Sequence, residues 1–245
     1  MKITRIDAIQ KKPLELLRGL RGHYKCPRGP NGEALGPLVG YAGRDLATGK
    51  QFVGYEYVNF AKAEPYRFVF DEWAVRMADG LRSLKPTVAM GMPMGGIMVA
   101  DSIGRALNCR VVYPEKKILA LANETSREKS KLVWGRHQLD PGNRVIIAED
   151  VLNNFSTTGE ALALVSDAGA EVVAIAGFLN RSLDQRQQFE DIPVVSLILT
   201  PIAEYRQEDP EVAAEIEKGN VAWKPKDEWD RLEAAMLAHP EPEQT

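Results

Sequence analysis

Two adjacent carboxylates, Glu149 and Asp150, follow an apolar run of the chain, and a short stretch of hydroxyl-bearing residues comes after them. A pair of carboxylates suits the two hydroxyls of a ribose, because its oxygens accept hydrogen bonds. Hydroxyl groups and backbone N–H groups at the start of a helix attract a phosphate. The pattern therefore predicts a site for a phosphorylated ribose, with the phosphate held by Ser156, Thr157, Thr158 and Gly159.

The elements around these residues place them at the edge of a sheet. Residues 145–148 are apolar and predict a buried strand, whereas residues 161–168 carry apolar side chains at helical spacing. Open α/β sheets bind their ligands outside the carboxyl ends of the strands, where the connecting loop lies. An ordinary strand-to-helix turn, with an acidic end and a Ser/Thr cap, is the alternative interpretation of this segment.

The segment resembles the signature of the type I phosphoribosyltransferases, in which a hydrophobic strand ends in Glu-Asp or Asp-Asp and a Thr/Gly loop holds a 5-phosphate. Glu149, Asp150, Thr157, Thr158 and Gly159 match this signature. The loop departs from the family, because eight residues separate Asp150 from Gly159 and the family usually has four. Residues 152–158 are therefore predicted to form an enlarged loop, with the carboxylate of Glu160 close to the phosphate.

Other segments extend the resemblance over roughly residues 45–200, and it is strongest to the orotate phosphoribosyltransferase branch. Residues 91–100 are similar to the family's pyrophosphate loop, in which Gly95 and Gly96 would let backbone amides approach the ligand. Residues 48–60 are similar to a strand whose Lys50 reaches the substrate and whose Tyr57 lines the base pocket. A plain turn, a solvated lysine and a core tyrosine are the alternatives for these residues.

The segment that ends in Lys116 and Lys117 is similar to the basic segment that precedes the family's mobile lid. Residues 118–132 would form this lid, with Arg127, Lys129 and Lys131 available to cover pyrophosphate; a solvated charged face is the alternative. His137 lies after the lid and is given no catalytic role.

The resemblance implies a central parallel sheet flanked by helices, an α/β fold, with a small N-terminal hood. It implies transfer of ribose 5-phosphate from phosphoribosyl pyrophosphate to a nucleobase, most simply orotate, with Mg²⁺ as cofactor. Glu149, Asp150 and Lys117 would be catalytic, and Asp150 would also hold the metal indirectly, through the substrate pyrophosphate. A transferase for another base and a non-catalytic regulator that binds phosphoribosyl pyrophosphate are the alternatives. Family members are commonly homodimers, and the same is expected here.

Composition narrows the choice of function. The formal charge of −3 over 245 residues gives no basic excess for nucleic acid. The two cysteines, Cys26 and Cys109, have no spacing typical of a zinc site or a disulfide framework, which favours a reducing cytoplasm. No signal-peptide pattern is present, and no apolar run reaches the length of about 18 residues that a membrane span needs. Neither nucleic acid nor a membrane is therefore an expected partner.

Periodicity predicts alternating strands and helices, which argues for a parallel sheet with crossover connections. The predicted domains are a hood over residues 1–44, a core over 45–206 and a helical tail over 207–245. The predicted strands are residues 52–60, 87–91, 109–113, 145–148, 172–178 and 194–199; the predicted helices are 9–20, 68–84, 97–107, 161–168 and 227–238, and residues 22–37 are predicted to be a loop.

Overall fold

The computed structural model describes residues 3–120, 129–155 and 157–240. Its chain forms two compact units: residues 1–16 with 63–201, and residues 17–62 with 202–245. The second unit thus joins residues from both ends of the chain, which the sequence-based domains had kept apart. The boundaries at residues 44 and 206 stay a prediction.

The first unit is built on a six-stranded sheet with the order β11-β12-β10-β9-β5-β6. All neighbouring strands run parallel except β11 and β12, which are antiparallel. The prediction of a mostly parallel central sheet is confirmed. The strands are β5 (Val88–Gly91), β6 (Arg110–Val112), β9 (Arg144–Leu152), β10 (Glu171–Asn180), β11 (Gln188–Phe189) and β12 (Ile192–Leu199).

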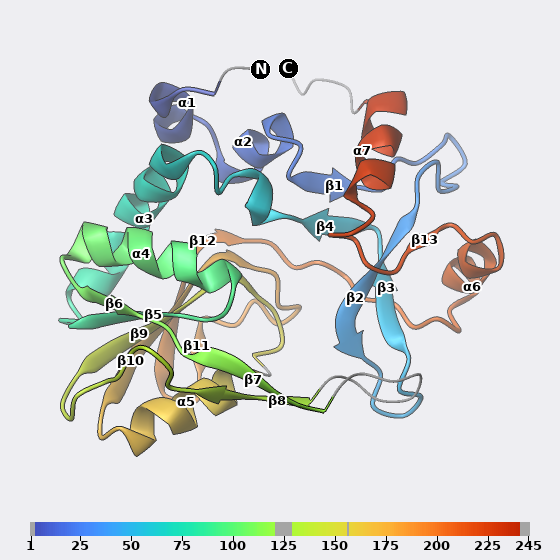
Figure 1. Ribbon diagram of the computed structural model, residues 1–245. Coiled ribbons are helices and arrows are strands. Elements are labelled where there is room, and N and C mark those ends of the chain that lie inside the picture. The colour runs from blue at the N-terminus through green and yellow to red at the C-terminus, as the bar shows by residue number, and fades with distance from the viewer. Residues whose placement is uncertain (1–2, 121–128, 156, 241–245) are drawn as a thin grey trace. The chain divides into compact units, whose positions relative to one another are not determined.

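Helices cover both faces of this sheet (Figure 1). The helices of the first unit are α1 (Arg5–Gln10), α3 (Arg67–Arg82), α4 (Gly95–Leu107) and α5 (Thr158–Asp167). Helices α3 and α4 lie on one face, and α5 lies on the other. Among the described residues, no helix combines the length and the apolar character that crossing a membrane requires.

The predicted helix over residues 9–20 is wrong in its extent. The chain forms α1 and then α2 (Pro13–Gly19), and Lys11 between them has an extended backbone. Pro13 fits the first position of α2 and disfavours a helical conformation at Lys12, so the helical pattern is interrupted at Lys11 and Lys12.

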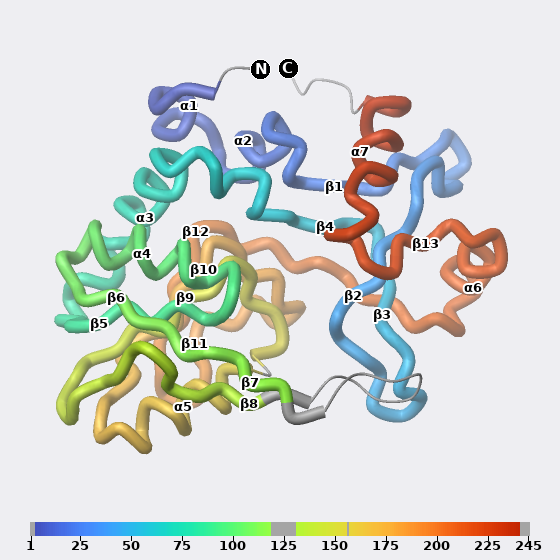
Figure 2. Tube along the Cα trace, in the orientation of Figure 1, coloured from blue at the N-terminus to red at the C-terminus, as the bar shows by residue number. Residues whose placement is uncertain are grey.

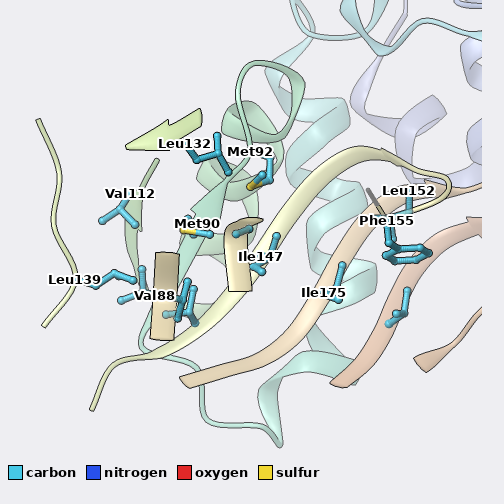
Figure 3. Packing of buried hydrophobic residues seen from close by; sticks show 14 residues of the cluster. Val88, Met90, Met92, Val112, Leu132, Leu139, Ile147, Leu152, Phe155 and Ile175 are labelled. Carbon is cyan, nitrogen blue, oxygen red and sulfur yellow. The ribbon is translucent and has the colours of Figure 1, made fainter. Parts of the chain in front are cut away.

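Alternation along the strands gives the sheet two apolar faces. Figure 3 shows one layer, in which Met90, Ile147 and Ile175 come from three neighbouring strands. The other face carries Phe178, whose ring makes edge-on contacts with Phe70 and Trp73 of α3 at centroid distances of 4.8 and 5.3 Å. Burial on both faces explains why these strands appear in the sequence as nearly unbroken apolar runs.

Strand order creates a topological switch point at one place along the sheet. The first parallel strand, β5, has β6 on one side and β9 on the other, so the connections from β5 and β9 leave in opposite directions. Open α/β sheets bind ligands at such a switch point, at the carboxyl ends of the strands. The residues that follow β5 and those at the end of β9 are therefore the ones that can share a ligand.

A hairpin contains the described residues of the predicted mobile lid. Strands β7 (Glu115–Ala120) and β8 (Lys129–Val133) form an antiparallel pair, so residues 118–120 and 129–132 belong to strands and not to a loop. Burial of Leu132 in the apolar layer of the first unit anchors β8. The charged residues around Leu132 in the sequence gave no indication of this burial. Residues 121–128, with Arg127, and the side chain of Lys129 lie outside the described part of the chain.

Among its described residues, the second unit contains two small sheets, the helices α6 and α7, and residues 17–19 of α2. A three-stranded sheet has the order β13-β2-β3, and a second sheet joins β1 to β4; Figure 2 traces the chain through them. The elements are α2, β1 (His23–Lys25), β2 (Leu38–Arg44), β3 (Gln51–Gly54), β4 (Glu56–Val58), a 3-10 turn (Phe60–Lys62), α6 (Pro210–Glu217), β13 (Val221–Ala222) and α7 (Trp229–Ala238).

Two predictions in this unit are wrong. The predicted strand over residues 52–60 is divided into β3 and β4, which pair with different strands, β2 and β1. The predicted loop over residues 22–37 contains β1, whose partner β4 lies more than thirty residues further along the chain. A strand of three residues that pairs over such a separation is too short to show a strand pattern in the sequence.

Candidate active site

Both carboxylates lie on β9, at the point where it loses one neighbour. The last residue pair between β5 and β9 is Gly91 with Ala148, and the Met92 amide donates to the Ala148 carbonyl at 2.9 Å. Strand β9 then continues beside β10 as far as Leu152. The acids therefore belong to the strand itself and face the switch point, whereas the sequence had predicted that the strand ends at Ala148.

Two glycines bring the loop after β5 against these acids. A Cβ added to Gly95 would overlap the carboxylate of Asp150, and one added to Gly96 would overlap the carbonyl oxygen of Ala148. Both glycines lie in the first turn of α4, so the helix starts directly at the acids. The pyrophosphate loop and the carboxylates, predicted separately from the sequence, are thus brought into one site.

The carboxylates strongly affect one another. The pKa of Glu149 is raised from 4.5 to about 8, first by burial and then by repulsion from Asp150. Lys116 and a hydrogen bond with the side chain of Thr157 oppose this rise. Glu149, Asp150, Lys116 and Thr157 therefore form one electrostatic group, and Glu149 can exchange a proton near neutral pH.

The two lysines of β7 lie on different faces of the hairpin. Lys116 pairs with Leu132, whose side chain is buried, and Lys117 pairs with Lys131. Because successive side chains of a strand point to opposite faces, only Lys116 shares the face on which Leu132 enters the core. The catalytic role predicted for Lys117 stays a prediction.

The loop between β9 and α5 is held by an aromatic anchor. Phe155 is 6% exposed and stacks on Phe189 at a centroid distance of 5.2 Å; Figure 3 shows it beside Leu152. Thr157 lies at the N-cap position of α5 without a side-chain capping hydrogen bond, Thr158 is buried, and a Cβ on Gly159 would meet nothing within 4 Å. Ser156 lies outside the described residues.

The predicted base-binding residues lie in the second unit. Lys50 forms an ion pair with Glu208 at 2.6 Å, and both side chains are about half exposed. Tyr57 packs near Trp229, at a centroid distance of 6.2 Å, and also lines a cavity of about 190 Å³ with Trp223. Their roles in substrate binding stay predictions.

Comparisons with known proteins agree with this geometry, although no family model matches the chain. The chain is 34% identical over 101 residues to an orotate phosphoribosyltransferase of Heliobacterium modesticaldum, which is 41% of this chain and 47% of that protein. It is 25% identical over 164 residues to the enzyme of that name from Caldanaerobacter subterraneus, over 67% of this chain and 79% of that protein. The chain thus spans about half the length of the first relative and about four fifths of the second.

A solved structure shows the fold. The orotate phosphoribosyltransferase of Aeropyrum pernix superposes with a TM-score of 0.51 at 13% identity, covering 75% of this chain and 91% of that one. This chain has the type I phosphoribosyltransferase fold. The resemblance found in the sequence is confirmed.

One residue of this phosphoribosyltransferase fold escaped the sequence reasoning. Arg181 is 8% exposed and directly follows β10, so it lies at the carboxyl edge of the sheet, one strand beyond the acids. Its backbone amide donates to the Leu152 carbonyl at 2.9 Å. An arginine directly after a strand with an apolar run over residues 172–179 was the available signal, because buried arginines recognise carboxylates and phosphates.

The carboxylates of Glu149 and Asp150 are of the right chemical kind for Mg²⁺. This ion is usually bound by one or two carboxylates together with substrate phosphates and water, so a pair of acids at the sheet edge fits it. Among the described residues, no group of three or more His, Cys, Asp or Glu side chains could hold a metal alone. A metal here would depend on the substrate for most of its ligands.

Gly96, at the start of α4, has no room for a side chain, whereas Gly159, at the start of α5, has open space around it. We predict that Gly96→Ala lowers the thermal midpoint by several degrees, because the added methyl group meets a backbone carbonyl that cannot move aside. Gly159→Ala is the matched control and should leave the midpoint unchanged or slightly higher, since alanine favours a helix. Differential scanning calorimetry measures both; equal midpoints for the two variants would contradict the close approach of α4 to β9.

The raised pKa of Glu149 predicts a pH-dependent stability. Between pH 4.5 and about 8, the folded protein holds a proton on Glu149 that the unfolded chain has lost, so this residue lowers stability progressively as the pH rises, and the loss is complete above pH 8. Glu149→Gln lacks this effect. Its thermal midpoint should exceed that of the wild type by an amount that grows through this window.

Melting curves between pH 4.5 and 9 measure the difference, with Glu160→Gln, an exposed position on α5, as the control for removing one carboxylate. A constant difference between Glu149→Gln and the wild type across the window would show that Glu149 titrates normally.

Proposed function

We propose that this protein transfers the ribose 5-phosphate group of phosphoribosyl pyrophosphate to orotate, releasing pyrophosphate. One observation carries the proposal: the Glu149–Asp150 pair and the glycines that start α4 meet at the switch point of the sheet. In this proposal the carboxylates bind the ribose hydroxyls, and the neighbouring backbone amides at the start of α4 suit pyrophosphate. The names of the relatives favour orotate as the base.

The reaction breaks the bond between ribose C1 and a pyrophosphate oxygen and forms one between C1 and a ring nitrogen of the base, which loses its proton. Positive charge develops on the ribose as the leaving group departs. Asp150 would stabilise that charge and, together with Glu149, bind the ribose hydroxyls, while Lys116 would offset the negative charge of the leaving group. Mg²⁺, when bound with the pyrophosphate, would supply further positive charge on the leaving-group side.

Orotate differs from uracil by a carboxylate, so selection of orotate requires a cation. Arg181 is a buried cation at the carboxyl edge of the first unit, and Lys50 is the cation that the resemblance assigns to the substrate. A transferase for another base, and a regulator that binds phosphoribosyl pyrophosphate without turnover, are the competing functions. The homodimer and the cytoplasmic location implied by the resemblance belong to the same proposal.

The first test is a base panel. Purified protein with phosphoribosyl pyrophosphate and Mg²⁺ should give orotidine 5′-phosphate and pyrophosphate with orotate, and no nucleotide with uracil, adenine, guanine, hypoxanthine or xanthine, as followed by chromatography. Asp150→Asn should reduce the rate by about a hundredfold or more, because the charge opposite the ribose is lost. Asp167→Asn, an exposed position on α5, is the control.

Each other outcome has a distinct meaning. Product with a different base would keep the mechanism and change the specificity. Binding of phosphoribosyl pyrophosphate without any product would favour the regulator, and an unchanged rate for Asp150→Asn would refute the site.

The lysines of β7 give a second test. We expect Lys116→Gln to lower kcat/KM by about a hundredfold, because its ammonium group acts on the same electrostatic group as Glu149. Lys117→Gln removes the same charge from the opposite face of the hairpin and should lower kcat/KM less. Steady-state kinetics distinguish the two; a larger loss in Lys117→Gln would instead support the catalytic role that the resemblance gives to Lys117.

A further inference from the structure

The loop that follows β10 packs against the loop that follows β9, at the carboxyl edge of the sheet. Residues 181–187 connect β10 to β11, and we call them the β10 loop. The backbone amide of Arg181 donates to the carbonyl of Leu152, the last residue of β9, at 2.9 Å. Further along, the side chain of Arg186 contacts the ring of Phe155. The two loops therefore meet through the backbone and through side chains.

The side-chain contact joins three flat groups. The rings of Phe155 and Phe189 lie 5.2 Å apart, centroid to centroid, with an interplanar angle of 20°. The guanidinium carbon of Arg186 lies 5.3 Å from the centroid of Phe155 and 5.7 Å from that of Phe189. A guanidinium within about 6 Å of a ring centroid is attracted by the ring. Arg186 therefore strengthens a contact that the two rings already make.

The β10 loop holds Arg186 in place at both its backbone and its guanidinium. Oδ2 of Asp184 accepts hydrogen bonds from Nε and Nη2 of Arg186 at 3.0 and 2.8 Å. The backbone amide of Arg186 donates to Oγ of Ser182 at 3.0 Å, and its carbonyl accepts from Nδ2 of Asn180 at 2.7 Å. Asn180 and Ser182 are buried. The cation beside the rings is thus fixed by the loop that carries it.

The backbone of Phe155 indicates that this position requires the ring and not only a turn of the chain. Its φ is 57°, in the left-handed region that glycine adopts freely and that other residues avoid. A turn that only had to redirect the chain would favour glycine or asparagine here. Burial of the ring among its aromatic and cationic neighbours stabilises the conformation instead.

The position of Phe155 determines where α5 starts. Its carbonyl accepts a hydrogen bond at 3.0 Å from the backbone amide of Thr158, the first residue of α5. Thr157 lies between them along the chain, and its side chain forms the hydrogen bond with Glu149. The resemblance assigns Thr157, Thr158 and Gly159 to the 5-phosphate. A displacement of Phe155 would therefore move the groups that are expected to hold this phosphate.

We infer that Phe155 and Arg186 are positioning residues for the phosphate end of the proposed active site, acting through Thr157 and Thr158. The inference rests on the proposed function, and it adds that the affinity for the 5-phosphate depends on the β10 loop. The glycines that start α4, which the proposal assigns to pyrophosphate, belong to a different loop. Loss of the aromatic contacts should therefore weaken binding of a sugar phosphate and leave binding of pyrophosphate unchanged.

Calorimetric titrations of the full chain with ribose 5-phosphate, and separately with pyrophosphate and Mg²⁺, measure the two ends of the site. Arg186→Gln removes the cation from the rings and should weaken ribose 5-phosphate binding about threefold, as expected for an exposed cation–π contact. Phe155→Leu keeps an apolar side chain but loses the stacked ring, and should weaken it by up to about tenfold. Both variants should bind pyrophosphate as the wild type does.

Arg110→Gln is the matched control. Arg110 forms an exposed ion pair with Asp140, as Arg186 does with Asp184, but it is the first residue of β6 and so lies at the amino edge of the sheet, away from the proposed site. This variant should bind both ligands as the wild type does. Melting curves check that the variants are folded; if Phe155→Leu is not, Arg186→Gln, whose side chain is partly exposed, decides alone.

Wild-type affinity for ribose 5-phosphate in Arg186→Gln and Phe155→Leu would overturn the inference. An equal loss of affinity for both ligands would also overturn it, because it would show a general effect on the structure and not the positioning of one end. A wild-type chain that binds neither ligand would refute the proposed site and this inference with it. The failures are distinguishable, since the first two results require a wild-type chain that binds ribose 5-phosphate.

Discussion

The site depends on glycine at positions 95 and 96, because any larger residue would carry a Cβ there. The loop after β5 must reach the carboxyl end of β9, and a single Cβ at either position would occupy space already taken by Asp150 or by the Ala148 carbonyl. The rest of the first unit maintains this approach: β5 and β9 are neighbours in the sheet, and α4 starts at the glycines and packs across both strands. Amide donors and carboxylate acceptors are consequently held side by side by backbone geometry, which is stiffer than any arrangement of flexible side chains.

This close approach has an electrostatic consequence. The folded protein holds a proton on Glu149 at neutral pH, first because burial disfavours its charged form and then because the carboxylate of Asp150 repels that form. Lys116 reduces the repulsion without removing it. A ligand with hydroxyl donors, or a cation bound with it, would relieve the repulsion between Glu149 and Asp150. The same repulsion that destabilises the folded protein would therefore favour binding of such a ligand. Sites that do chemistry commonly show this opposition between stability and function.

The sequence predicted the parts of this molecule whose signals are local. The strands β5, β6, β9, β10 and β12 and the helices α3, α4, α5 and α7 follow apolar runs or helical spacing, and the acids and glycines follow motif resemblance. It did not predict β1, β2, β8, β11 or β13. Strands β1 and β13 pair with strands more than thirty residues away along the chain, and β8 belongs to a hairpin whose charged residues gave no strand pattern. It also missed the hydrogen-bond chain from Glu56 through His23 to Arg18, since three residues on three elements share no pattern in the sequence.

The enlarged loop after β9 shows how a motif can change length and still keep its ends in place. Each doubling of the length of a flexible loop adds only about 0.6 kcal/mol to the entropic cost of closing it, so the free energy of folding tolerates a longer loop. A longer loop alone would, however, leave the start of α5 less well positioned. Phe155 prevents this. Its buried ring stacks on Phe189, and the guanidinium of Arg186 lies 5.3 Å from the ring centroid. The chain is thus fixed two residues before Thr157, whose side chain then reaches Glu149. The aromatic contacts of Phe155 therefore hold the path between the acids and the start of α5.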